Sequence, residues 1–454
     1  MADNDNISLL DFLQARSCTT GDAACITYAG ETLSYAELDR RSSALAAALC
    51  RSGVNKGDRV AILARNSVAF YELIFACAKT GAIMLPINWR LSGREIAGIM
   101  NDGKPVVVLV DPDLKHLLAA SVASMIALDD AYDRWRDAPG EEYSPGSHSS
   151  ARDTLLLLYT SGTTGMPKGV MLCHDNLLYS ARMAREIWHF TSNSVNLVAM
   201  PLFHIGGIGY GMMALTQGGH TVLLQQPEPA ALLAAIEQYA VTHAFFVPAV
   251  IQSLVDSDGV DGMALSSLEL IVYGASPISE TLLLRAMDVL GCGFTHAYGL
   301  TETSGTVISL PPEDHDPGGR HVERLKSCGQ PLPWVEAALF DPDTNKTVPV
   351  GEVGEIWIRS GMNMLGYWGK PAETATTLRS DNWLRTGDAA YCDEDGYFYI
   401  HDRFKDMIVS GGENIYPTEI ENVLYEHSAV AETAVIGVPH SHWGETPKAI
   451  VCLL

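Results

Sequence analysis

Residues 159–169 read Tyr-Thr-Ser-Gly-Thr-Thr-Gly-Met-Pro-Lys-Gly and directly follow the apolar run Leu155–Leu158. The stretch holds three glycines, four Ser/Thr hydroxyls and one lysine in eleven positions. Glycines let backbone N–H groups approach an anion closely, hydroxyls donate hydrogen bonds, and the lysine adds positive charge. It is not a Walker A loop, because Pro167 precedes Lys168 and Gly169 follows it. A flexible surface turn is the alternative, but the apolar run predicts a strand that anchors the loop, so we expect a polyphosphate cradle.

The first hundred residues alternate between strand and helix patterns. Ser34 and Glu37 predict a capping box, and the helix that follows them ends before Gly53. Three short apolar runs predict strands at Val60–Leu63, Ile83–Ile87 and Val106–Val110. A longer run, Phe70–Lys79, predicts a helix. This alternation predicts an α/β fold with layered, buried and partly parallel sheets.

The pattern changes in the second half of the chain. Residues 133–152 are rich in Pro, Gly, Ser and charge, which predicts a surface loop. From Gly351 onward, short strands are expected at Glu355–Ile358 and Tyr397–Ile400. A helix is expected at Thr418–Tyr425, followed by a strand at Ala434–Val438. We therefore expect a large N-terminal domain of several subdomains over residues 1–401. Residues 402–454 would begin a small, mobile α+β domain that is incomplete in this sequence.

Composition excludes several classes of protein. The 454 residues carry a formal net charge of -24, with 47% hydrophobic and 19% charged residues, so the chain is globular and nucleic acid is not an expected partner. Nine scattered cysteines form no C-x-x-C pair, which favours reduced thiols and a cytoplasmic protein. No signal peptide or membrane-spanning run is visible.

Six stretches, in this order along the chain, resemble the motifs of the adenylate-forming superfamily, which includes acyl- and aryl-CoA ligases, luciferases and peptide-synthetase adenylation domains. The resemblance covers nearly the whole chain and is nearest to acyl-CoA ligases. Besides the glycine-rich loop, the matching stretches are Ala78–Asn88, Pro201–His204, Tyr273–Ser276, Tyr298–Glu302, Leu384–Asp388 and Asp402–Asp406.

The resemblance implies a role for each motif in binding ATP. The phosphates would lie on Thr160, Ser161, Gly162, Thr163, Thr164, Gly165 and Lys168, and the adenine between Tyr298 and the Gly274, Ala275 and Ser276 backbone, with Ala297 and Gly299 beside it. Thr301 would donate to the α-phosphate, and Asp388 with Arg403 would hold the ribose. Glu302 and Thr164 would bind Mg²⁺, a hard cation that prefers oxygen ligands. Lys168, Thr301, Glu302 and His204 would be the catalytic residues.

The acid and coenzyme A would meet around His204, which in the family lies between the acyl pocket and the pantetheine channel. A hydrogen-bonded core histidine is the alternative. Gly206, Gly207, Gly209 and Gly211 leave volume there, and no Arg or Lys occurs among them, which argues against a dicarboxylate. Gly411 and Gly412 match the loop that faces the thiol, and Lys405 matches the hinge. The family's adenylation lysine would fall beyond Leu454, and residues Val451–Leu454 are expected to form an interrupted strand.

The expected reaction follows from the chemistry of a carboxylate, which is a poor electrophile. Attack of the acid on the α-phosphate of ATP gives an acyl adenylate and pyrophosphate, and coenzyme A then displaces AMP. The sequence therefore predicts an acid–CoA ligase for a fatty or aryl acid, with ATP, Mg²⁺ and coenzyme A. Three alternatives stay open: a carrier-protein-loading module, a luciferase-like oxygenase and a catalytically silent nucleotide-binding protein. A homodimer is also left open.

Overall fold

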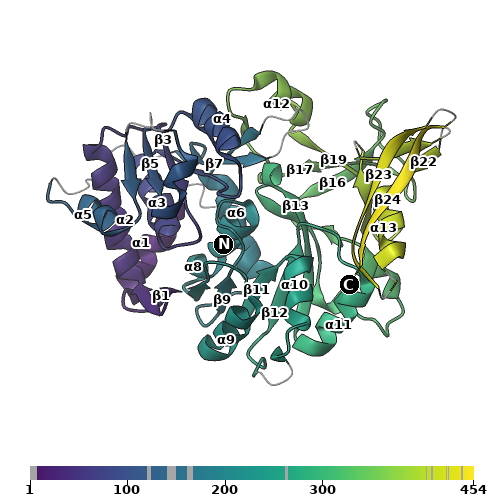
Figure 1. The fold of residues 1–454 in the computed structure, drawn as a ribbon, viewed down its shortest axis with the longest axis horizontal. Coiled ribbons are helices and arrows are strands. Elements are labelled where there is room, and N and C mark those ends of the chain that lie inside the picture. The colour runs from purple at the N-terminus through teal and green to yellow at the C-terminus, as the bar shows by residue number, and fades with distance from the viewer. Residues whose placement is uncertain are drawn as a thin grey trace.

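The computed structural model describes residues 8–119, 124–140, 150–160, 167–260, 264–404, 406–410, 413–425, 427, 429–440 and 443–453. Within these residues the strands form two large mixed sheets and two smaller antiparallel ones (Figure 1). The two large sheets and their helices make up the body of the molecule, and the last sheet lies at one side of it.

A seven-stranded sheet carries the glycine-rich loop. Its strand order is β18-β8-β7-β4-β3-β5-β6. The central strands from β7 to β6 are parallel, whereas β8 and β18 are added antiparallel at one edge. The strands are β3 (Arg59–Leu63), β4 (Ile83–Pro86), β5 (Val107–Val110), β6 (Met125–Ala127), β7 (Thr154–Thr160), β8 (Lys168–Cys173) and β18 (Gly366–Tyr367).

A nine-stranded sheet has the order β15-β14-β13-β12-β11-β9-β10-β1-β2. The run from β1 to β13 is parallel, so the carboxyl ends of β9, β11, β12 and β13 lie along one edge. Ligands of open α/β sheets bind outside such edges. The strands are β1 (Ala24–Tyr28), β2 (Glu31–Ser34), β9 (Val195–Val198), β10 (His220–Leu223), β11 (His243–Phe246), β12 (Leu270–Gly274), β13 (Gly293–Leu300), β14 (Gly305–Leu310) and β15 (Gln330–Pro331).

Helices cover the faces of these sheets, so most strands are buried on both sides. Along β3, Val60 and Ile62 belong to the main core, while Ala61 and Leu63 belong to a second core under α4. This two-sided burial explains why the run is apolar throughout. The helices of the body are α1 (Leu9–Thr20), α2 (Tyr35–Arg51), α3 (Ala69–Thr80), α4 (Gly93–Gly103), α5 (Asp130–Arg136), α6 (His174–Glu186), α7 (Ile205–Gly211), α8 (Met213–Gln217), α9 (Pro229–Tyr239), α10 (Pro248–Val255), α11 (Glu280–Leu290) and α12 (Pro371–Thr377).

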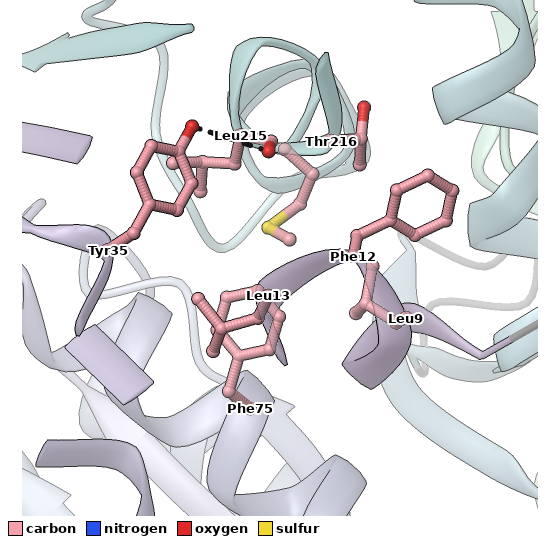
Figure 2. Close-up of a pocket in the computed structure, with 8 residues that line it drawn as sticks. Leu9, Phe12, Leu13, Tyr35, Phe75, Leu215 and Thr216 are labelled. Atoms are coloured by element: carbon pink, nitrogen blue, oxygen red, sulfur yellow. Dashed lines mark hydrogen bonds between the residues drawn. The ribbon is translucent and has the colours of Figure 1, made fainter. Parts of the chain in front are cut away.

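A small recess lies where α1, α2, α3 and α8 pack together (Figure 2). Leu9, Leu13, Phe75 and Leu215 line it, and the buried Tyr35 hydroxyl donates to the Leu215 carbonyl at 3.4 Å and to the Gly219 carbonyl at 2.6 Å. Its lining carries no charged side chain. The recess is therefore a feature of core packing.

Two antiparallel sheets complete the chain. The first has the order β16-β17-β19-β20, and the second has the order β22-β21-β24-β23 and packs against α13. The elements are β16 (Glu336–Phe340), β17 (Gly354–Arg359), β19 (Trp383–Cys392), β20 (Phe398–Arg403), β21 (Ile408–Ser410), β22 (Glu413–Ile415), α13 (Pro417–Tyr425), β23 (Val430–His440) and β24 (Gly444–Leu453). The fold is thus a large mixed α/β N-terminal part followed by a small C-terminal β domain.

Most expected elements are present, with three differences. Residues 133–136 belong to α5 rather than to a loop, since the Asp129 side chain caps this short helix by accepting from the Ala131 N–H. Only half of the capping box forms: Ser34 accepts from the Glu37 N–H, whereas the Glu37 carboxylate pairs with Arg40 and Arg41. Strand β20 stays paired with β19 through Arg403, so the expected boundary at residue 402 falls inside a strand.

Candidate active site

The glycine-rich stretch connects β7 to β8, which pair antiparallel. Thr160 at the end of β7 lies opposite Lys168 at the start of β8. The two ends of the expected phosphate cradle are therefore adjacent. The loop residues Ser161, Gly162, Thr163, Thr164 and Gly165 lie outside the described residues.

The expected adenine-binding backbone lies where β12 ends beside β13, with Gly274 paired to Ala297. A Cβ atom on Gly274 would lie 2.2 Å from the Ala297 carbonyl oxygen, and one on Gly299 would lie 1.9 Å from that of Gly305. Glycine is therefore required at both positions. Ala275 has φ of 66° and is exposed, as is Ser276. A left-handed conformation is unfavourable for alanine, and such residues cluster at functional sites.

The expected ribose-binding residues meet the expected adenine-stacking residue. The buried Tyr298 hydroxyl on β13 donates to Asp388 Oδ2 on β19 at 2.6 Å. Arg403 Nε on β20 lies 3.4 Å from Asp388 Oδ1. Burial raises the pKa of Asp388, while the Tyr298 hydroxyl and the Arg403 charge act in the opposite direction. A buried carboxylate with these two partners is a fixed acceptor at the sheet edge.

Thr301 and Glu302 lie on a single 3-10 turn, Thr301–Thr303, that follows β13 directly. The Thr303 side chain closes the turn by accepting from the Leu300 N–H and donating to the Gly305 carbonyl. The turn is further tied to the segment before β18, because the Met364 N–H donates to the Glu302 carbonyl at 2.8 Å. The backbone that carries Glu302 is thus fixed on both sides.

Tyr367 on β18 contacts both Glu302 and Lys168, and no motif in the sequence had indicated it. Its hydroxyl donates to Glu302 Oε1 at 2.9 Å, and Lys168 Nζ lies 5.0 Å from the centre of its ring. No local signal could have found it, because a tyrosine in a two-residue edge strand has no characteristic spacing. The pairing of β18 with β8 brings Tyr367 close to Lys168, and the Met364–Glu302 backbone hydrogen bond brings it close to Glu302.

His204 is the N-cap of α7 and lies exposed at one end of an apolar region. Desolvation of the imidazole by its apolar neighbours, and then the charge of Arg90, lower the pKa of the ring below its usual value. Farther along, a Cβ atom on Gly206 would lie 3.0 Å from the ring of Phe245 on β11, and that ring is 5.5 Å from the Tyr210 ring. An apolar group entering here would meet Phe245.

The expectation that four glycines open the acyl region is wrong for two of them. A Cβ atom on Gly207 would lie 2.0 Å from the Pro201 carbonyl oxygen, and one on Gly211 would lie 2.5 Å from the Tyr71 hydroxyl. These two glycines allow α7 to pack closely against its neighbours. Gly206 borders the Phe245 ring, and Gly209 borders the side chain of Ile205.

Arg90 is a second residue that the sequence analysis missed. Its guanidinium lies 4.8 Å from the Trp89 ring and 5.8 Å from the Phe203 ring. The glycine stretch itself holds no Arg or Lys, but Arg90, from a distant segment that follows β4, brings a positive charge beside His204. The segment Ala78–Asn88, which ends two residues earlier, was the only signal for it.

Three further expected residues, Lys405, Gly411 and Gly412, lie outside the described residues. Among the described residues there is no cluster of three or more His, Cys, Asp or Glu side chains that could hold a metal. A lone carboxylate suits Mg²⁺, which binds few protein ligands and takes the rest from phosphate and water. Glu302 fits, because only Oε1 has a hydrogen-bond partner in the described part of the chain. No helix within the described ranges combines the length and the hydropathy that a membrane span requires.

The layered α/β fold, with Lys168 and the Glu302 carboxylate on either side of Tyr367 at one sheet edge, is the fold of enzymes that activate an acid with a nucleotide. The chain belongs to the AMP-binding enzyme family: the family model matches residues 13–368, and the model of the AMP-binding enzyme C-terminal domain matches residues 419–454.

Relatives and solved structures agree with this membership. A fatty acid–[acyl-carrier-protein] ligase of Streptomyces coeruleorubidus is 39% identical over 433 residues, which cover 93% of this chain and 82% of that protein. A feruloyl-CoA synthase of an Amycolatopsis species is 39% identical over 431 residues, which cover 94% of this chain and 85% of that protein. The o-succinylbenzoate CoA synthetase of Bacillus subtilis, solved with its acyl-adenylate intermediate, superimposes with a TM-score of 0.88 at 30% identity, covering 98% and 88%. The same enzyme with ATP and magnesium gives 0.87, covering 97% and 89%.

The chain is accordingly an AMP-forming acid–CoA ligase. It uses ATP, Mg²⁺ and coenzyme A, and its reaction passes through an acyl adenylate.

Proposed function

We propose that the enzyme activates a monocarboxylic acid with an apolar body, either a fatty or an aryl acid, and transfers its acyl group to coenzyme A. The observation that carries this proposal is the position of the apolar region between α7 and β11 beside the Glu302 turn. Ile205, the first residue of α7, connects the apolar region to the turn. A Cβ atom built on Gly305, just past the turn, would lie 3.8 Å from Ile205 Cγ1. The carboxylate end of the acid would then lie near the phosphates and its apolar end near Phe245.

Each residue at the sheet edge has a proposed task. Lys168, with Thr160 and the loop residues, binds the phosphates, Thr301 donates to the α-phosphate, and Asp388 with Arg403 accepts the ribose. Adenine lies between Tyr298 and the Gly274–Ser276 backbone. Both reactants of the first step are anions, so the protein must align them and offset their charge. Mg²⁺ at Glu302 and Thr164 would supply further positive charge at the phosphates.

We assign the second step to the region of His204. The imidazole lies at the exposed end of the apolar region, and we propose that the thiol of coenzyme A reaches the acyl carbon from this end. Gly411 and Gly412 would face the thiol after the small domain reorients about Lys405, and we place the domain boundary near Asp402, at the end of β20. Such rotations pivot on a few residues at the ends of elements.

The positive charge of Arg90 does not favour a dicarboxylic acid over a monocarboxylic acid, because of where it lies. Its guanidinium packs on the rings of Trp89 and Phe203, next to exposed His204, and makes no cation–π contact with buried Phe245. A second carboxylate at the inner end of the acid would therefore meet aromatic rings and no cation, which is unfavourable.

A panel of acids tests the proposal. Release of pyrophosphate should be fastest with medium-chain or aromatic monocarboxylates and weak with malonate or amino acids. Robust turnover of malonate or of an amino acid would contradict it. The same assay with a carrier protein in place of coenzyme A tests the one alternative acceptor that a relative's name suggests.

Two wider proposals concern the setting. We propose a cytoplasmic location, supported by nine cysteines that are all free thiols. Trapping free thiols rapidly in intact cells would test whether they are reduced. Homodimerisation stays a proposal, which light scattering on the purified protein would decide.

A further inference from the structure

Tyr367 contacts both charged groups that the proposed site directs toward the phosphates. Its hydroxyl donates to the Glu302 carboxylate at 2.9 Å, and its ring faces the Lys168 ammonium at 5.0 Å. The side chain is buried, with 7% of its surface exposed.

The backbone around Tyr367 is fixed from both sides. The Tyr367 N–H donates to Thr374 Oγ1 at 2.9 Å, which ties it to α12. The Trp368 N–H donates to the Gly169 carbonyl at 2.7 Å, next to Lys168 in the chain. Gly366, with φ of 140°, allows the turn into β18. The backbone that carries the ring is therefore tied to α12 and to the residue that follows Lys168.

We propose that Tyr367 is a positioning residue that sets the Glu302 carboxylate for the metal and the Lys168 ammonium for the phosphates. This inference rests on the proposed function, because it assumes those two tasks. The hydroxyl occupies Oε1, so among the described residues Oε2 is the oxygen without a hydrogen-bond partner and the one that would face the metal.

The ring holds Lys168 without neutralising it. An aromatic face attracts an ammonium group through its quadrupole, whereas a carboxylate would cancel the charge. Among the described residues no carboxylate forms an ion pair with Lys168. The full positive charge therefore remains available to a polyphosphate, and it stays close to the metal ligand without a direct contact between them.

Two substitutions separate the two contacts. Tyr367→Phe removes the hydroxyl and keeps the ring, while Tyr367→Leu removes both. The measurement is calorimetric binding of α,β-methylene-ATP, which cannot be cleaved at the reacting bond, at increasing Mg²⁺ and without Mg²⁺. Tyr367→Phe should raise the Mg²⁺ concentration for half-maximal binding about tenfold and leave metal-free affinity within about twofold, because a hydrogen bond to a charged group is lost. Tyr367→Leu should also weaken metal-free binding several-fold.

A matched control lies elsewhere in the chain. The buried Tyr397 hydroxyl donates to Asp314 Oδ2 at 2.7 Å, and Arg324 lies 4.1 Å from its ring centre, so it has the same chemistry outside the site. Tyr397→Phe should leave both affinities unchanged, even where it lowers thermal stability as much as Tyr367→Phe does.

The outcomes distinguish this inference from the function on which it rests. If Glu302→Gln and Lys168→Ala weaken binding but Tyr367→Phe leaves the Mg²⁺ dependence unchanged, the positioning role is wrong. The positioning role is also wrong if Tyr397→Phe shifts the Mg²⁺ dependence as much as Tyr367→Phe does. If Glu302→Gln and Lys168→Ala have no effect either, the site assignment itself fails.

Discussion

The Tyr298 hydroxyl on β13 donates a hydrogen bond of 2.6 Å to Asp388 Oδ2 on β19. The two residues are 90 positions apart and belong to different sheets. This contact joins the nine-stranded sheet to the four-stranded sheet at the proposed nucleotide site. It also couples the proposed adenine-stacking residue to the proposed ribose acceptor.

The pH dependence of nucleotide use should report this contact. Burial raises the pKa of Asp388, and the Tyr298 hydroxyl opposes that rise by stabilising the carboxylate. Tyr298→Phe removes the stabilisation, so the pKa should rise further and the carboxylate should be lost at higher pH. We expect the acid limb of kcat/KM for ATP, measured from about pH 5 to about pH 8, to move upward. An acid limb that stays in place or moves downward would rule out this coupling.

Charge removal at the phosphates should be costly. Lys168→Ala and Glu302→Ala should each slow pyrophosphate exchange by about 10²-fold or more, since each removes charge that stabilises the transition state. Lys346→Ala, on an exposed turn between β16 and β17, is a suitable control. Exchange rates near wild type for either site variant would refute the assignment.

The acyl region should narrow when Gly206 gains a side chain. A Cβ atom there would lie 3.0 Å from the Phe245 ring, so Gly206→Val must push into the space beside it. We expect kcat/KM to fall about tenfold or more for bulky acids and much less for short ones, with the KM for ATP unchanged. Gly93→Ala, whose new Cβ would lie 3.5 Å from the Leu117 carbonyl oxygen, should leave the acid preference as it is. Equal losses for all acids would mean that Gly206 serves only packing.

His204→Ala should affect the two half-reactions differently. The imidazole lies exposed at the end of the apolar region, where the thiol would enter. Acyl-CoA formation from synthetic acyl adenylate should fall about tenfold more than pyrophosphate exchange does. Equal effects on both steps would favour the alternative of a structural histidine.

Stability should depend on a buried ion pair far from the site. Arg136 Nη1 on α5 lies 3.2 Å from Glu72 Oε2 on α3, with side-chain exposures of 5% and 2%. Arg136→Ala removes the nearer of the two guanidinium groups that pair with the buried Glu72 carboxylate, the other being Arg41 at 3.6 Å, and should lower the free energy of unfolding by about 3 kcal/mol. Arg285→Ala breaks a pair with exposed Asp256 and should cost about 1 kcal/mol or less. Denaturant melts of both variants make the comparison, and similar losses would contradict it.

Local patterns predicted helices and strands well where the element is buried on both sides. The runs at Val60–Leu63 and Phe70–Lys79 became β3 and α3 almost to the residue. The pattern failed at 133–136, where a polar composition hid a helix whose Tyr132 and Arg136 side chains are buried against Glu72 on α3. It also failed at Glu37, because Arg40 and Arg41 compete for the carboxylate that a capping box needs.

The sequence by itself determined the α/β layering, the family and the placement of the glycine-rich stretch between two strands, because hydrophobic period and glycine spacing act over a few residues. Only the tertiary structure decided which side chains share the site. Tyr367 meets Glu302 and Lys168, and Arg90 meets His204, through strand pairing and packing between segments that are distant along the chain. Gly207 and Gly211 likewise turned out to serve backbone packing, since the space beside a glycine depends on what the fold places there. Contacts of this kind have no local spacing, and so no periodicity in the sequence records them.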